Sequence, residues 1–272
     1  MPRFVPPTMS RRAVHAAAPM QQRLRMLMMG CPGSGKGTLS ARLERQLGVP
    51  VLTAGDMLRW HVRHGTEVGR EADRVIRAGT LMPDTTMMRL VGPELAKRRD
   101  GDWILDGFPR TDAQAERLHE FLEAEHLPLS LVVHLIVPEE VILQRILERW
   151  THMPSGRVYN LSFNPPKRAG IDDVTGEPLE KRDDDNPATF KRRIDGYHEV
   201  TEPMIERFRQ LACPSDPSRP LLVPLAGATS DEIWPQLQAL IHERFPYMAT
   251  RTSSCPADAG GAAGPSSAPT TA

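Results

Sequence analysis

The chain has 272 residues, with 34 lysines and arginines balanced by 34 aspartates and glutamates, so its formal net charge at pH 7 is zero. This length suffices for one domain with insertions or for two small domains. The balanced charge excludes an overall basic field of the kind that drives nonspecific nucleic-acid binding. Three widely spaced cysteines fit neither a disulfide framework nor a metal cluster, which is typical of a reducing compartment. No apolar run reaches the length of a membrane span.

The amino-terminal segment differs from the rest of the chain. Five arginines precede Gly30, whereas the first acidic residue is Glu44. An arginine-rich, acid-poor and partly alanine-rich start is typical of a mitochondrial leader. The alternative is a disordered basic extension without a targeting role, and Met9 or Met20 could also be the true start. We therefore predict a leader or a disordered extension over residues 1–22.

The next segment predicts a phosphate-binding loop. An apolar run over residues 26–29 indicates a short buried strand, residues 30–38 read GCPGSGKGT, and residues 39–47 have the apolar spacing of a helix. Glycines allow the backbone N–H groups of such a loop to surround an anion, and the amino terminus of the helix adds partial positive charge. Lys36 would then reach the outer phosphates of a nucleoside triphosphate. The alternative is a flexible Gly/Ser turn.

Short apolar runs and helical patterns alternate along the rest of the chain. Residues 49–52, 103–105, 131–137 and 221–225 predict strands, and residues 84–98, 113–125, 138–149 and 187–211 predict helices. This alternation predicts an α/β fold with a mostly parallel sheet covered on both faces. Ligands in such sheets bind beyond the carboxyl ends of the strands, where the phosphate loop would lie.

A second polar motif follows the strand predicted at residues 103–105. Asp106 stands where a magnesium ion with its waters needs a negative partner, and Arg110 offers a planar fork suited to a phosphate. Gln114 completes a helix capping box that begins at Thr111, so its role stays open between capping and base recognition.

Two further segments break the alternation. Residues 153–185 are rich in Pro, Gly, Asn and Asp, and a structureless loop of that length is uncommon in a compact domain. We predict a small inserted β-rich lid over residues 148–185. From residue 248 to residue 272 the chain is rich in Ser, Thr, Ala, Gly and Pro and almost uncharged, which predicts a disordered tail.

From residue 25 to about residue 247, the order of these motifs resembles the adenylate kinases, a family of nucleoside monophosphate kinases. Gly37 and Thr38 follow Lys36 where the general phosphate loop has Ser or Thr directly after the lysine. The likeness continues through GDMLR at residues 55–59, GTLMPD at residues 79–84, DGFPR at residues 106–110, and the long lid. Arg149-Trp150-Thr151-His152 and Tyr159-Asn160 most resemble the mitochondrial GTP:AMP phosphotransferase branch.

The resemblance implies a P-loop NTPase-type core over residues 23–247, with an inserted NMP-binding segment at residues 53–82 and the lid. It implies that GTP is bound by Gly33, Ser34, Gly35, Lys36, Gly37, Thr38, Arg149, Val158, Tyr159 and Thr229. It implies that AMP is bound by Ala54, Arg59, Thr80, Leu81, Met82, Gly107, Phe108, Pro109, Arg110, Gln114, Arg182 and Arg193. The implied catalytic cations are Lys36, Arg110, Arg145, Arg149, Arg182 and Arg193, with magnesium as cofactor, held by Asp106 through water.

The chain departs from the family pattern at two places. Ala54 stands where the family has a Ser or Thr whose hydroxyl meets AMP, so either Thr53 substitutes for it or that hydrogen bond is absent. In some relatives two Cys-x-x-Cys pairs in the lid bind zinc, and the matching positions here are His152, Ser155, Asp172 and Thr175. This set is poor for zinc, which prefers thiolate and imidazole, so we predict a hydrogen-bonded cluster and no zinc site.

The resemblance implies magnesium-dependent phosphoryl transfer from GTP, or less efficiently ITP or ATP, to AMP by a monomer in the mitochondrial matrix. The substrates would be small nucleotides, with neither nucleic acid nor membrane as a partner. Two alternatives stay open: a general ATP:AMP adenylate kinase, which could be cytoplasmic, and a catalytically weak nucleotide-binding interaction protein. No hydrolase triad is evident, which agrees with a reaction in which AMP itself carries the attacking oxygen.

Overall fold

The computed structural model describes residues 22–214 and 216–248. The predicted leader, apart from Gln22, and the predicted tail, apart from Met248, lie outside the described residues. Within the described part of the chain, no helix is both long enough and apolar enough to cross a membrane.

Five parallel strands form the central sheet, in the order β2-β3-β1-β4-β9. They are β1 (Arg25–Gly30), β2 (Val51–Thr53), β3 (Trp103–Asp106), β4 (Leu131–Ile136) and β9 (Leu222–Ala226). Each matches a predicted apolar run with its bounds shifted by a few residues or fewer. The predicted α/β fold with a parallel sheet is therefore confirmed.

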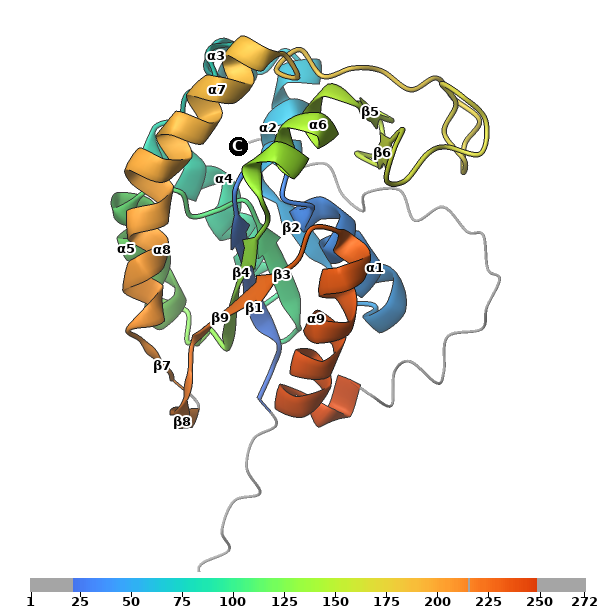
Figure 1. Cartoon of the computed structure of the whole chain (residues 1–272). Coiled ribbons are helices and arrows are strands. Elements are labelled where there is room, and N and C mark those ends of the chain that lie inside the picture. Colours follow the sequence, from blue (N-terminus) through green and yellow to red (C-terminus); the bar gives the residue numbers. More distant parts are fainter. Residues whose placement is uncertain (1–21, 215, 249–272) are drawn as a thin grey trace, which may run out of the picture.

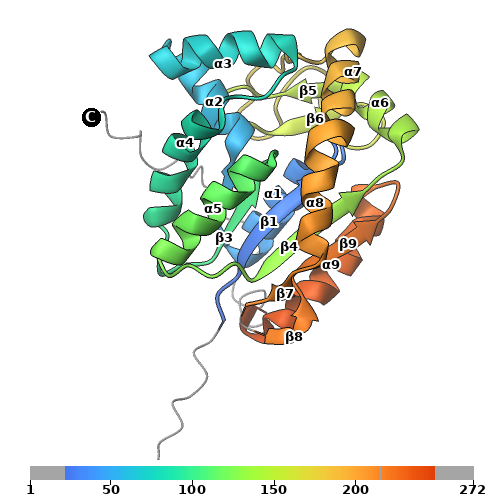
Figure 2. The same cartoon turned by 90° about the vertical axis from the view of Figure 1, so that its left-hand side faces the viewer.

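Helices cover both faces of this sheet (Figures 1 and 2). On one face α1 (Lys36–Leu47) and α9 (Ser230–Arg244) pack against Met26 and Met28 of β1. On the other face α4 (Asp84–Ala96), α5 (Asp112–Ala124) and α8 (Glu202–Arg209) pack with Leu27 and Met29 of the same strand. Successive side chains of a strand point to opposite faces, so the apolar run at residues 26–29 of this one strand contributes to two separate cores.

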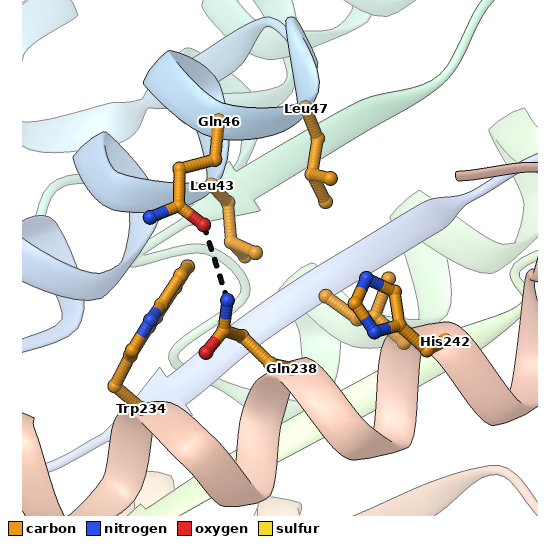
Figure 3. Close-up of a pocket in the computed structure, with 7 residues that line it drawn as sticks. Leu43, Gln46, Leu47, Trp234, Gln238 and His242 are labelled. Carbon is orange, nitrogen blue, oxygen red and sulfur yellow. Dashed lines mark hydrogen bonds between the residues drawn. The ribbon is translucent and has the colours of Figure 1, made fainter. Parts of the chain in front are cut away.

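A hollow between α1 and α9 lies at the end of α1 that is farther from the phosphate loop (Figure 3). Leu43, Leu47 and Trp234 are among the residues that line it, and Gln238 Nε2 donates to Gln46 Oε1 across it at 3.1 Å. The two helices are thus tied directly to each other, and this hollow belongs to their packing.

The helix predicted at residues 187–211 is interrupted. It consists of α7 (Pro187–Gly196), a π-helical turn over Tyr197–Thr201, and α8. In the π turn the Glu202 N–H donates to the Tyr197 carbonyl, five residues back. Pro203 accounts for the interruption, because its ring would clash with the Glu199 carbonyl in a regular α-helix. The predicted helical stretch is thus confirmed to within two residues of its end, whereas the π turn inside it was not predicted, and Pro203 was the signal for it in the sequence.

The predicted NMP-binding segment contains α2 (Ala54–Arg63) and α3 (Glu67–Ala78), which pack against each other. The predicted lid follows α6 (Glu139–Leu147) and contains the antiparallel pair β5 (Arg149–Thr151) and β6 (Val158–Asn160), extended by a bridge between Thr151 and Glu180. A short hairpin of β7 (Ala212–Cys213) and β8 (Asp216–Pro220) and a 3-10 turn at Pro246–Met248 were not predicted.

Candidate active site

The predicted phosphate loop joins the carboxyl end of β1 to the first turn of α1. Gly33 and Gly35 have φ angles of +86° and +90°, a backbone region that residues with a side chain rarely adopt. A Cβ at Gly33 would also lie 2.7 Å from Ile142 Cγ2. Lys36 Nζ donates to the Gly30 and Cys31 carbonyls at 2.8 and 2.9 Å, so its ammonium lies inside the loop.

Lys36 and Asp106 form the charged floor of this loop. Burial lowers the pKa of Lys36 to about 8, and the nearby Asp106 carboxylate opposes this shift. Burial also raises the pKa of Asp106, against the effect of Lys36. A Cβ at Gly37 would lie 3.9 Å from Asp106 Oδ2, so the carboxylate reaches the start of α1. The structure thus brings together the side chains predicted to hold triphosphate and metal.

Arg110 lies in the loop between β3 and α5 and is fixed on several sides. Its Nε donates to the Gly107 carbonyl at 2.8 Å, and its N–H donates to Gln114 Oε1 at 2.8 Å. The Gln114 N–H in turn donates to Thr111 Oγ1 at 3.1 Å, which caps α5. Gln114 is 2% exposed, and its Nε2 donates to none of the described residues. Its oxygen therefore holds the loop, and its amide nitrogen keeps its capacity to donate, so the predicted choice between capping and base recognition stays open.

Several arginines from different segments act on one another's charge, and three of them are held by acidic partners. Arg59 Nη2 donates to Asp56 at 2.5 Å, Arg149 Nε donates to Asp185 at 2.8 Å, and Arg193 forms an ion pair with Asp184. Desolvation, reinforced by Arg59 and Arg149, lowers the pKa of Arg182 to about 9. Desolvation and Arg193 lower the pKa of Arg110 to about 10.

Besides desolvation, the neighbouring positive charges at the carboxyl end of the sheet lower one another's pKa values. Lys36 has both Arg110 and Arg193 among the charges that lower its pKa. A polyanion placed between them would relieve this repulsion, because each guanidinium gains a charge-assisted partner. The structure therefore brings together Lys36, Arg59, Arg110, Arg149, Arg182 and Arg193 from the predicted site.

Arg145 does not join this group. Its Nη2 donates to the Ala228 carbonyl at 2.6 Å, and its guanidinium lies 4.9 Å from the centre of the Phe163 ring. Glu232 is the charge that acts on its pKa, which burial lowers. Its buried Nη1 has no hydrogen-bond partner among the described residues and would lie 3.7 Å from a Cβ at Gly35. Arg145 thus lies beside the phosphate loop with partners different from those of the other cations predicted to be catalytic.

Three other residues predicted to bind GTP already have partners within the protein. The Tyr159 hydroxyl donates to Asp172 at 2.9 Å within the lid, so its side chain is already engaged away from the phosphate loop. Val158 pairs with Thr151 in the β5–β6 ladder. The Thr229 hydroxyl accepts from the Glu232 N–H at 3.1 Å and caps α9, next to the Ala228 carbonyl that holds Arg145.

Most of the residues predicted to bind AMP lie on three segments, and Gln114, Arg182 and Arg193 lie on α5, the lid and α7. Ala54 is 2% exposed at the first position of α2, directly after β2. Thr80, Leu81 and Met82 join α3 to α4, and Met82 is buried in the core. The third segment is the loop from Gly107 to Arg110 with the buried Phe108. Thr53 pairs with Asp106 across the sheet, and its hydroxyl makes no hydrogen bond with the described residues.

We expect Ala54→Ser to lower the KM for AMP about two- to tenfold and to leave the KM for the nucleoside triphosphate nearly unchanged. One added neutral hydrogen bond contributes about 0.5–1.5 kcal/mol and acts locally. Steady-state kinetics with each substrate varied in turn measures both constants. An unchanged or raised AMP constant would mean that Thr53 already supplies the contact or that the buried site has no room for the hydroxyl.

The four lid positions that match the zinc-binding cysteines lie in a hydrogen-bonded cluster. His152 Nδ1 lies 2.7 Å from Ser155 Oγ, and Thr175 Oγ1 donates to Asp172 at 2.9 Å. Asp172 also accepts from Arg157 at 2.6 Å, and these hydrogen bonds hold the pKa of its carboxyl far below the usual range. No group of His, Cys, Asp and Glu suited to a metal ion occurs among residues 22–214 and 216–248.

We expect His152→Ala to lower the melting temperature by about 4–8 °C. The imidazole is 1% exposed and also contacts Glu177 at 2.6 Å, so its loss leaves partners unsatisfied at a cost of about 1–3 kcal/mol. His119→Ala is the matched control, since His119 is exposed on α5 and its replacement should change the melting temperature little.

Metal analysis of the purified protein tests the predicted absence of zinc from the lid. One tightly held zinc per chain, or a fold lost on chelation, would contradict that prediction.

The lid contacts the NMP-binding segment directly, which the sequence did not suggest. Arg63 at the end of α2 donates to the Met153 carbonyl, and Arg77 lies 3.2 Å from Asp183. A Cβ at Gly156 would lie 3.3 Å from an Asp56 carboxylate oxygen. The two insertions thus meet over the charged space.

A parallel sheet with a glycine-rich loop, a partly buried lysine inside that loop and a converging set of arginines defines a P-loop nucleotide-binding protein. The model of the adenylate kinase family matches residues 28–213. A mitochondrial GTP:AMP phosphotransferase of Saccharomyces cerevisiae is 43% identical over 227 residues, which cover 82% of this chain and 94% of the yeast protein. Its counterpart from strain ATCC 204508 / S288c is 43% identical over 216 residues, covering 78% and 92% of the two chains.

The chain belongs to the adenylate kinase family. This confirms the predicted family and the predicted class of enzyme, a phosphotransferase whose partners are small nucleotides.

Proposed function

We propose that the chain transfers a phosphoryl group reversibly from GTP to AMP, giving GDP and ADP, in the mitochondrial matrix. The converging cations around Lys36 and Arg110 are the observation that carries the reaction type. The printed names of the two yeast relatives support GTP as donor, AMP as acceptor and a mitochondrial location.

Phosphoryl transfer requires positioning and positive charge more than a protein nucleophile, because an AMP phosphate oxygen makes the attack. Lys36 would hold the outer phosphates of the donor, and Arg59 and Arg110 would hold the AMP phosphate. Arg149, Arg182 and Arg193 would neutralise the transferring group from the lid side. Contacts between the lid and the NMP-binding segment would exclude water, which would otherwise hydrolyse the donor.

Magnesium is the proposed cofactor, and the residues present fit it. Asp106 is 4% exposed at the end of β3, close to the start of α1, and the Thr38 side chain is half-buried in the first turn of that helix. Carboxylate and hydroxyl oxygens suit this hard cation, which commonly keeps several waters. Asp106 would hold it through water. Bound magnesium would neutralise negative charge on the phosphates of the donor.

The donor base is proposed to lie against Arg145, not Arg149. The Arg145 guanidinium, the Phe163 ring and the backbone at Ala228 and Thr229 form one surface beside the phosphate loop. Arg149 is held by the buried carboxylate of Asp185 among the phosphate-binding cations. This gives Arg145 a binding role in place of the predicted catalytic one.

The deciding experiment is a coupled assay that offers GTP or ATP with AMP to the purified protein. We expect kcat/KM to be at least tenfold higher with GTP. An unpaired polar edge of the wrong base in a closed site costs about 1–3 kcal/mol. Equal or higher efficiency with ATP would favour a general adenylate kinase. Protease protection of the tagged full-length protein in isolated mitochondria tests the proposed matrix location. A variant that lacks residues 1–22 is the control.

A further inference from the structure

The π-helical turn at Tyr197–Thr201 lies between two parts of the candidate site. It follows the last turn of α7, which carries Arg193, and it precedes α8, which packs beside the loop that carries Arg110. Both end residues of the turn are buried, whereas residues 198–200 are exposed. The turn therefore presents Tyr197 and Thr201 to the protein interior.

Each of these two side chains makes one long-range hydrogen bond. The Tyr197 hydroxyl lies 3.0 Å from His134 Nε2 in β4, which fastens the start of the turn to the sheet. Thr201 Oγ1 donates to the Arg110 carbonyl at 2.9 Å, across 91 positions of sequence. The end of the turn is thus fastened to the residue whose guanidinium faces the charged space.

Arg110 lies in a loop, so its position depends on hydrogen bonds such as the one from Thr201. This loop follows Gly107, whose φ is +77°, and precedes the helix that starts at Asp112. Gln114 fixes its N–H and Gly107 fixes its Nε, both from the same loop and helix. Thr201 fixes its carbonyl from a different part of the fold, and this contact sets the loop relative to α7 and Arg193.

We propose that Thr201 is a positioning residue that acts through Arg110, so that the π turn holds Arg110 and Arg193 in register for phosphoryl transfer. The proposal rests on the proposed function of the site. Thr201 is 8% exposed and need not contact a nucleotide for this role. A misplacement of the guanidinium lowers the rate more than it lowers binding, because the transition state demands tighter geometry than the ground state.

The test compares Thr201→Val, which keeps the shape of the side chain and removes the hydroxyl, with Thr201→Ser, which keeps the hydroxyl. We expect Thr201→Val to lower kcat about three- to tenfold with a smaller change in the KM for AMP, and Thr201→Ser to retain more than half of the parental kcat. Tyr197→Phe is the matched control. It removes the other hydrogen bond of the same turn, so it should lower the melting temperature by about 2–4 °C and leave kcat within twofold.

A double-mutant cycle with Arg110→Ala separates positioning from general damage. If Thr201 acts through the guanidinium, adding Thr201→Val to Arg110→Ala changes kcat no further. Equal loss in both backgrounds, a parental kcat in Thr201→Val, or equal losses in Thr201→Val and Tyr197→Phe would overturn the proposal. If instead Arg110→Ala alone leaves kcat within threefold of the parent, the result refutes the role of Arg110 in the proposed function, on which the proposal for Thr201 rests.

Discussion

Lys36→Met is expected to lower kcat/KM for the triphosphate donor by about 10²–10³, equivalent to ~2.7–4 kcal/mol of transition-state stabilisation. Methionine keeps most of the volume of the buried lysine and removes its charge. It also leaves the Gly30 and Cys31 carbonyls without this donor, which partly offsets the gain from no longer burying an ammonium. The fold should therefore persist.

Coupled kinetics and thermal melts of parent and variant measure both effects. Lys97→Met is the matched control, since Lys97 is exposed at the end of α4 and forms an ion pair of 2.7 Å with nearby Glu94. It should leave both quantities unchanged. A Lys36→Met rate within threefold of the parent, less than ~0.7 kcal/mol of barrier, would refute the assigned role.

Because the pKa of Lys36 is lowered, raising the pH should affect the stability of the fold and the activity in opposite directions. Its pKa is about 8 in the fold, against 10.5 as the ordinary value. Between these pH values the unfolded chain binds more protons than the fold, so this group makes the fold more stable as pH rises. The ammonium that holds phosphate is lost over the same range. We expect kcat/KM for the donor, which reports on the free enzyme, to fall above pH 8. A flat profile to about pH 9.5 would contradict this reading.

The second large effect is expected at Arg110. Arg110→Ala should lower kcat by about 10²–10³, and Arg110→Lys should recover only part of it, because an ammonium cannot make the paired contacts of a planar guanidinium. The backbone contacts of this residue to Gln114 and Thr201 do not need its side chain, so the loop should persist. Arg117→Ala on the exposed face of α5 is the control. Full recovery by lysine would show that only charge matters here.

The phosphate loop was predictable because its determinants are contiguous. Strand, glycines, lysine and helix follow one another within residues 25–47, and each has a local physical reason. The sheet was predictable for a similar reason, since each of its strands is a short apolar run between turn signals. The bounds moved by a few residues because sheet pairing, which involves distant residues, sets where a strand ends.

The arginines show where sequence reasoning stopped. Arg145 and Arg149 are four residues apart, and a helix over residues 138–149 would place both on one face. In the structure α6 ends at Leu147 and Arg149 begins β5, and the two side chains have different partners, the Ala228 carbonyl for Arg145 and Asp185 for Arg149. The acidic partners of these cations were not assigned either. Asp56 pairs with Arg59 at i,i+3 spacing within α2, a signal that the sequence did offer. Asp185 pairs with Arg149 across 36 positions of sequence, and such a pair is set by the tertiary fold.

The contact of Gly156 with Asp56 has a consequence for turnover. The lid contacts the helix that begins at Ala54 through Gly156 and the Met153 carbonyl, so we expect these contacts to open when AMP enters the proposed acceptor site. Arrival of one substrate and departure of the other product then share one mechanical event, the separation of Arg63 from the Met153 carbonyl. We therefore expect the opening of these contacts between the lid and α2, rather than the transfer of the phosphoryl group itself, to limit the turnover of the proposed reaction.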